Sequence, residues 1–186
     1  MMDYQISIGK LKRKLPLVKI DENTQIASFV LLGDTELTVE ATRQLKDQLN
    51  LNFDFVVTLE SKGIPLAHEL TRQTNRDRYV VIRKRIKAYM TEPVVTTVKS
   101  ITTSEPQQLV LDGMDAAMLS GKRVVLLDDV ISTGGSLKAA EELLARVDCQ
   151  VVAKAAILAE GAAAQRNDII YLASLPLFDS RGRIKD

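Results

Sequence analysis

The feature that most constrains this chain is a short apolar run that ends in two acidic residues. Residues 124–127 read Val-Val-Leu-Leu, which suits a strand buried on both faces of a parallel sheet. Asp128 and Asp129 follow directly. Because a charged pair without partners does not stay in an apolar interior, we expect the strand to leave the core at these two acids.

The loop after the acids consists of small or hydroxyl-bearing residues that let backbone N–H groups converge on an anion: Ser132, Thr133, Gly134, Gly135 and Ser136. Apolar residues then recur at helical spacing, so we expect a helix over residues 137–146 whose positive N-terminal end points back at the loop. Two acids that accept hydrogen bonds from vicinal hydroxyls lie beside this anion site. The combination implies a sugar phosphate as ligand.

Two common phosphate-binding loops do not fit this stretch. A P-loop requires a lysine after its last glycine, and none follows Gly135; the pattern G-x-G-x-x-G is also absent. The order of apolar strand, two acids, two residues and small-Thr-Gly-Gly-hydroxyl closely resembles the phosphoribosyl-pyrophosphate (PRPP) binding motif of type I phosphoribosyltransferases. The structural alternative is an ordinary strand-to-helix turn with an acidic edge.

Length and charge favour a single domain that handles small molecules. The chain has 186 residues, enough for one well-buried α/β domain over residues 1–186. The net charge of +1 gives no field for a nucleic-acid backbone, so we expect no DNA partner. A lone Cys149, a charged N-terminus and no apolar run approaching about eighteen residues predict a cytoplasmic protein without membrane contact.

A second loop of the same kind follows an earlier strand. Residues 53–59 predict a central strand, and Pro65 suits the first turn of a helix over residues 64–74. In type I phosphoribosyltransferases the loop between these elements contacts pyrophosphate. The resemblance therefore implies that Ser61, Lys62 and Gly63 bind the diphosphate, with Lys62 facing it and Gly63 allowing close backbone approach. Taken alone, Lys62 reads as a solvated turn lysine.

A cluster of cations follows the third expected strand, residues 79–82. Residues 83–87 carry four positive charges. Adenine-type enzymes of the family have a similar strand followed by Arg-Lys, and this resemblance assigns Arg83, Lys84 and Lys87 to the surroundings of the diphosphate and the 5-phosphate. One or two of them can equally be solvated.

The family resemblance also organises the rest of the chain. It implies an α/β fold with a Rossmann-like central parallel sheet flanked by helices, a small N-terminal hood over residues 1–35 and a mobile flap over residues 88–112. The patterns predict extended segments at 4–20, a strand at 25–32, a helix capped by Asp34 or Thr35, and later strands at 150–158 and 169–177 before a polar tail. Within the flap, Glu92 and Glu105 are candidates for protonating a purine.

The resemblance implies a purine phosphoribosyltransferase, in which Asp128 and Asp129 fix the ribose 2- and 3-hydroxyls. Enzymes of the family for hypoxanthine and guanine have a third acid where this chain has Ser132, so adenine is the expected base and AMP the product. Xanthine enzymes also have a small residue there and remain an alternative; Lys62 departs from the usual adenine-enzyme loop. We expect a homodimer, and Mg²⁺ held mainly by the oxygens of PRPP, because no His, Cys or Asp cluster has metal-ligand spacing.

A non-catalytic alternative remains open. Residues 62–67 and 97–100 resemble the effector domain of the purine-operon repressor of Gram-positive bacteria, which senses PRPP with the same fold. From the sequence we expect neither that repressor's winged-helix domain nor a strongly basic face. The alternative reading is therefore a PRPP-sensing protein of purine metabolism.

Overall fold

The central element is a five-stranded parallel sheet. The computed structural model describes residues 2–98 and 107–185. The strand order is β10-β9-β8-β4-β5, and every pair of neighbours is parallel. The strands are β4 (Phe55–Leu59), β5 (Tyr79–Ile82), β8 (Arg123–Ile131), β9 (Gln150–Glu160) and β10 (Ile170–Leu175). The expected α/β fold with a central parallel sheet is confirmed.

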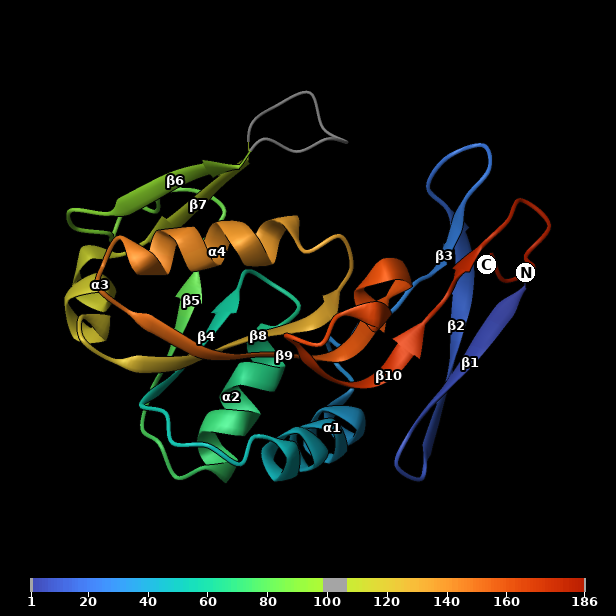
Figure 1. Cartoon of the computed structure of the whole chain (residues 1–186), viewed down its shortest axis with the longest axis horizontal. Helices are drawn as coiled ribbons and strands as arrows, with labels where there is room; N and C mark the ends of the chain where they lie inside the picture. Colours follow the sequence, from blue (N-terminus) through green and yellow to red (C-terminus); the bar gives the residue numbers. More distant parts are fainter. Residues whose placement is uncertain (1, 99–106, 186) are drawn as a thin grey trace.

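Helices cover both faces of this sheet, as Figure 1 shows. Val125 and Leu127 of β8 pack in one apolar cluster with α1 (Thr35–Gln48) and α2 (Ile64–Gln73). Val124 and Leu126 pack in a second cluster with α3 (Gly113–Leu119) and α4 (Gly135–Ala145). Because alternate residues of the strand enter two different cores, the run is apolar without alternation.

The chain leaves β4 and β8 in opposite directions, which makes their junction a topological switch point. From β4 it passes through α2 to β5 on one side, and from β8 through α4 to β9 on the other. The pairing of β4 with β8 runs only from Phe55↔Val124 to Thr58↔Leu127. Ligands of open α/β sheets bind in the crevice outside the carboxyl ends of the strands at such a point.

A smaller antiparallel sheet joins the two ends of the chain (Figure 1). Its order is β1-β2-β3-β11, and its strands are β1 (Asp3–Ile8), β2 (Leu11–Lys19), β3 (Gln25–Ala27) and β11 (Leu177–Phe178). The strand expected over 25–32 thus ends at Ala27. The strand expected over 169–177 is divided at Pro176, where the chain passes from the central sheet to the smaller one. The tail is not wholly polar, because Phe178 is buried and packs edge-on against Tyr4.

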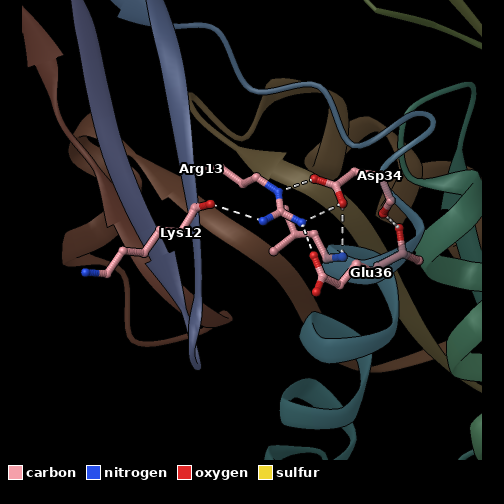
Figure 2. A network of polar contacts seen from close by, with 6 residues as sticks. Lys12, Arg13, Asp34 and Glu36 are labelled. Atoms are coloured by element: carbon pink, nitrogen blue, oxygen red, sulfur yellow. Dashed lines mark hydrogen bonds and ion pairs between the residues drawn. The ribbon is translucent and has the colours of Figure 1, made fainter.

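One arginine fastens the small sheet to the helical layer, as Figure 2 shows. Arg13 of β2 donates from Nε to Asp34 Oδ2 at 2.6 Å and from Nη2 to Asp34 Oδ1 at 2.9 Å. The same Nη2 reaches Glu36 Oε2 at 2.8 Å. Asp34 also caps α1 by accepting a hydrogen bond from the backbone N–H of Leu37. The N-cap is therefore Asp34, and it serves two elements at once.

A two-stranded hairpin completes the fold. β6 (Val94–Val98) pairs antiparallel with β7 (Gln107–Leu111), as the extended hairpin expected within residues 88–112 requires. Residues 99–106, with Glu105 among them, lie outside the described residues. A short 3₁₀ helix, η1 (Gly161–Gln165), follows β9. Among the described helices, none is long and apolar enough to cross a membrane.

Candidate active site

The acidic pair lies inside β8 and not beyond its end. β8 continues through Val130 and Ile131 because β9 keeps pairing with it, from Asp128↔Ala156 to Ile131↔Ala159. On the other side of β8, the pairing with β4 has already stopped at Leu127. The expectation that the strand ends at the acids is therefore wrong. One edge of the strand holds the acids in the sheet while the other opens into the crevice.

Burial sets the electrostatics of this pair. The backbone N–H of Asp129 donates to Asp128 Oδ1 at 2.9 Å, and Asp129 itself is only 3% exposed. Burial raises the pKa of Asp128 to about 7, and the neighbouring negative charge of Asp129 adds to the increase. Near neutral pH, the Asp128 carboxyl group beside Asp129 is therefore protonated part of the time.

Lys62 supplies the positive charge nearest the pair. Its Nζ lies 3.3 Å from Asp129 Oδ2, and its side chain is about half exposed. The geometry is that of an ion pair and not of an aligned hydrogen bond, because Asp129 Oδ2 is buried without a hydrogen-bond partner among the described residues. The structure thus brings Lys62 to the acids, and it leaves one carboxylate oxygen able to accept a donor from a ligand.

Gly63 shows how closely the loop after β4 approaches the strands β4 and β8. A Cβ atom at this position would overlap Thr58 Oγ1 and would lie 3.1 Å from Asp128 Oδ1. Gly63 is the N-cap residue of α2, and Pro65 stands in the first turn as the sequence predicts. The structure thus shows Gly63 close to protein atoms. Its expected close approach to the diphosphate stays a prediction.

The small-residue loop lines a cavity of about 70 Å³, together with Asp128, Val130, Ile131 and Leu137. All five predicted loop residues, Ser132, Thr133, Gly134, Gly135 and Ser136, contribute to its wall. α4 begins at Gly135, two residues before the predicted start, because Gly134 takes the left-handed conformation with φ of +79° and ends the loop. The N–H groups of the first turn have no acceptor within the helix and so suit an anion.

The cations after β5 gather around an acid that the sequence reading did not single out, Glu60. Arg83 Nη2 lies 3.2 Å and Lys87 Nζ 3.6 Å from Glu60 Oε1, and the backbone N–H of Lys84 donates to Glu60 Oε2 at 3.0 Å. The hydrogen bond from Lys84, with Arg83 and Lys87 nearby, lowers the pKa of Glu60. Lys84 keeps an exposed side chain.

Other residues predicted for the site make no described contact with the acidic pair. Ser61 is exposed, and its carbonyl accepts a hydrogen bond from the N–H of Ile64. Glu92 precedes β6, is exposed, and its backbone carbonyl lies against Gly113 at the start of α3. Among the described contacts, none joins Glu92, Arg83 or Lys84 to the acidic pair. Glu105 lies outside the described residues.

Two further residues at this edge were missed. Glu160 ends β9, and burial raises its pKa while the charge of Lys62 opposes the increase. Arg166 follows η1 and reaches Gly134. Glu60 and Glu160 each end a predicted parallel strand, and this position was the signal that could have found them, because carboxyl ends of parallel strands share one edge. Arg166 carries no comparable signal.

Comparison with known families identifies the chain. A family model described as phosphoribosyl transferase domain matches residues 36–177, which include the central sheet and both loops. The chain belongs to the type I phosphoribosyltransferases. Its relatives include proteins named hypoxanthine/guanine phosphoribosyltransferase from Methanococcus voltae, 32% identical over 73% of this chain and 68% of that protein, and from Methanobacterium paludis, 30% identical over 82% and 80%.

Solved structures show the same fold for this phosphoribosyltransferase. Adenine phosphoribosyltransferase from Thermoanaerobacter pseudethanolicus superposes with a TM-score of 0.64 at 22% identity, covering 77% of this chain and 84% of that one. The Saccharomyces cerevisiae adenine phosphoribosyltransferase, in complex with an imino-altritol bisphosphate and adenine, gives a TM-score of 0.62 at 18% identity, covering 92% of both chains. At these identities the likeness concerns the fold. The expected resemblance to the purine-operon repressor stays a prediction.

Proposed function

We propose that this phosphoribosyltransferase transfers ribose 5-phosphate from PRPP to a purine base and releases pyrophosphate. The observation that carries the proposal is that Asp128 lines the same cavity as the five small residues of the following loop. A carboxylate and an anion-binding loop on one wall match the two ends of a phosphorylated ribose. The curated relatives, named for purine substrates, support the purine.

Each part of the site then has a task in the reaction. Asp128 and Asp129 accept hydrogen bonds from the ribose hydroxyls, and a hydroxyl would supply the donor that Asp129 Oδ2 lacks. The loop from Ser132 to Ser136 holds the 5-phosphate. Ser61, Lys62 and Gly63 face the leaving diphosphate, with Arg83, Lys84 and Lys87 nearby. A purine nitrogen attacks C1 of the ribose as the bond to pyrophosphate breaks, through an oxocarbenium-like transition state.

This chemistry needs positioning and charge stabilisation, and no covalent nucleophile. The family uses Mg²⁺, which when bound would neutralise charge on the diphosphate. The described residues contain no group of three or more His, Cys, Asp or Glu side chains that could hold a metal by themselves. We propose an ion bound mainly through oxygens of PRPP; any protein oxygen that it needs would come from Asp128 or Asp129.

Adenine is the base we propose, because Ser132 stands where family enzymes for hypoxanthine and guanine carry a third acid. The second candidate is a 6-oxopurine, favoured by relatives at 30–34% identity that are named for hypoxanthine and guanine. These relatives weaken the argument from Ser132, and xanthine remains a further alternative. Glu92 and Glu105 stay the candidates for the proton donor.

The remaining expectations are proposals about the whole protein. We propose one domain over residues 1–186, with a hood at 1–35 and a flap at 88–112, acting as a cytoplasmic homodimer without DNA. The alternative of a PRPP sensor without catalysis predicts that PRPP binds but does not react. The two candidates differ in turnover and not in affinity.

A steady-state assay separates these possibilities. Purified protein with PRPP and Mg²⁺ is offered adenine, hypoxanthine, guanine and xanthine in turn, and pyrophosphate release is measured. The proposal predicts release with at least one purine and the highest kcat/KM with adenine. Greater kcat/KM with hypoxanthine or guanine would replace adenine by a 6-oxopurine. Tight PRPP binding without release from any of the four bases would favour the sensor.

A further inference from the structure

A guanidinium outside the cavity contacts the loop that forms it. Arg166 Nη1 occupies the space that a Cβ on Gly134 would need. Gly134 lines the cavity, whereas Arg166 is not among the lining residues. The contact therefore reaches the loop from beside the cavity, at the glycine whose left-handed φ of +79° leads into α4. The left-handed backbone conformation favours glycine there, and a Cβ atom would also have to displace the Arg166 guanidinium.

The guanidinium is held in a fixed orientation. Its Nε donates to Asp168 Oδ1 at 2.9 Å and its Nη2 to Asp168 Oδ2 at 2.8 Å. This two-point contact with one carboxylate leaves Nη1 as the amino group directed at Gly134. Hydrogen bonds from Arg166 and from Lys154 lower the pKa of Asp168, so the carboxylate stays ionised at neutral pH.

The same contacts extend back to the helix that follows the loop. Lys154 of β9 places Nζ 2.8 Å from Asp168 Oδ2 and 3.0 Å from Glu141 Oε1 of α4. A chain of alternating charges thus runs from α4 through Lys154 and Asp168 to Arg166, and returns to Gly134 at the start of the helix. Both the loop and the second turn of α4 are fastened to the strand beneath them.

A loop of glycine and hydroxyl residues needs such support, because ordering a flexible loop around a ligand costs free energy of binding. We propose that Arg166, held by Asp168 and Lys154, is a positioning residue that keeps the Ser132–Ser136 loop in its anion-binding conformation. This inference rests on the proposed function, since it takes the loop as the 5-phosphate site.

Calorimetry with two partial ligands tests the proposal on the full chain. Ribose 5-phosphate reports on the loop, and pyrophosphate with Mg²⁺ reports on the other end of the site. For Arg166→Met we expect ribose 5-phosphate to bind about tenfold more weakly, and pyrophosphate to change by less than about twofold. In the steady-state reaction, KM for PRPP should rise by a similar factor while kcat changes little.

Arg43→Met is the matched control. Arg43 makes the same two-point contact, from Nε at 3.0 Å and Nη2 at 2.8 Å to Glu40, on the exposed face of α1. The Arg43→Met variant should bind ribose 5-phosphate and pyrophosphate as tightly as the wild type. If Arg166→Met does not fold, Arg166→Lys replaces it in the test. Lysine keeps an ion pair with Asp168 but offers no second amino group to Gly134. We expect the same loss of affinity for ribose 5-phosphate, with little change for pyrophosphate.

Unchanged affinity for ribose 5-phosphate in a folded Arg166 variant would overturn the proposal. An equal loss of affinity for ribose 5-phosphate and for pyrophosphate would also overturn it, because it would indicate a general structural role. A wild-type protein that binds neither ribose 5-phosphate nor PRPP would instead refute the proposed function itself, and this inference with it.

Discussion

At the scale of single residues, the acidic pair shows what sequence can and cannot predict. The order of apolar run, Asp128, Asp129 and small loop placed a carboxylate beside the loop, and the structure has Asp128 in the wall of that cavity. The raised pKa of Asp128 could not be predicted, because it comes from burial by segments distant in the chain. The ion pair of Lys62 with Asp129 joins residues 67 positions apart and has no local signal.

The raised pKa predicts how stability depends on pH. Between about 3.9, the value for an unfolded aspartate, and about 7, folded Asp128 holds a proton that the unfolded chain releases. The free energy of unfolding therefore decreases as pH rises through this window, by at most about 1.4 kcal/mol for each pH unit. Asp128→Asn should remove this component, as urea unfolding at pH 5 and pH 7.5 would measure. The exposed control Asp47→Asn should keep the wild-type decrease; an unchanged decrease in Asp128→Asn would disprove the assignment.

Lys62 offers a test of the diphosphate loop. Removing its charge in Lys62→Ala should weaken pyrophosphate binding about tenfold or more, and nucleoside monophosphate binding by less than about threefold. The reason is that only pyrophosphate would lie against this loop. Titration calorimetry with both ligands gives the comparison, with exposed Lys46→Ala on α1 as control. An equal loss of affinity for pyrophosphate and for nucleoside monophosphate would place Lys62 outside the diphosphate site.

At the scale of elements, local patterns predicted the helices and central strands better than the places where they end. The helix after Gly63, the capped helix at Asp34 and the strand at residues 79–82 were confirmed. β8 was predicted too short, because its last four residues are held by pairing with β9, a long-range contact. α4 starts earlier than its apolar spacing indicates, since Gly135 and Ser136 add about half a turn without apolar side chains.

The junction of β4 with α2 depends on the absence of a side chain at Gly63. Gly63→Ala would place a methyl group against Thr58 Oγ1 and near Asp128 Oδ1, and should cost about 1–3 kcal/mol of unfolding free energy. Thr58→Ala removes the closest atom, a hydroxyl without a hydrogen-bond partner among the described residues. The double variant Gly63→Ala/Thr58→Ala should therefore recover most of the loss in urea unfolding.

Gly135→Ala serves as control for this pair, because the nearest atom to its new methyl group is Thr133 Oγ1 at 3.8 Å. We expect it to unfold at a urea concentration close to that of the wild type. If Gly63→Ala is as stable as Gly135→Ala, the close contact with Thr58 and Asp128 does not constrain this loop.

At the scale of the whole molecule, the small sheet shows the limit of sequence reasoning most clearly. The N-terminal extended segments were predicted, but not that β11 from the other end of the chain pairs with β3. Nor could the contact of Arg13 with Asp34 be predicted, because Arg13 stands among lysines within residues 10–14, a pattern typical of a solvated face. Such pairings are chosen by the packed fold and leave no periodicity in the sequence.

The joint between the small sheet and α1 can be tested by removing either partner. Arg13→Met loses a partly exposed ion pair and should cost about 0.5–1 kcal/mol. Asp34→Ala loses the same pair and the helix cap, so it should cost about 1 kcal/mol more. Urea unfolding of both variants measures the difference, and exposed Arg43→Met should change little. Equal costs for Arg13→Met and Asp34→Ala would show that the cap contributes nothing.

The central claim is that the acidic pair of β8 and the loop after it hold a phosphorylated ribose together. The most direct measurement is calorimetric binding of PRPP, with Mg²⁺, to wild type and to Asp128→Asn/Asp129→Asn, with urea unfolding to show that the variant is folded. The account predicts binding by wild type and loss of binding, by more than about a hundredfold, in the folded variant. PRPP affinity that survives both substitutions would contradict it.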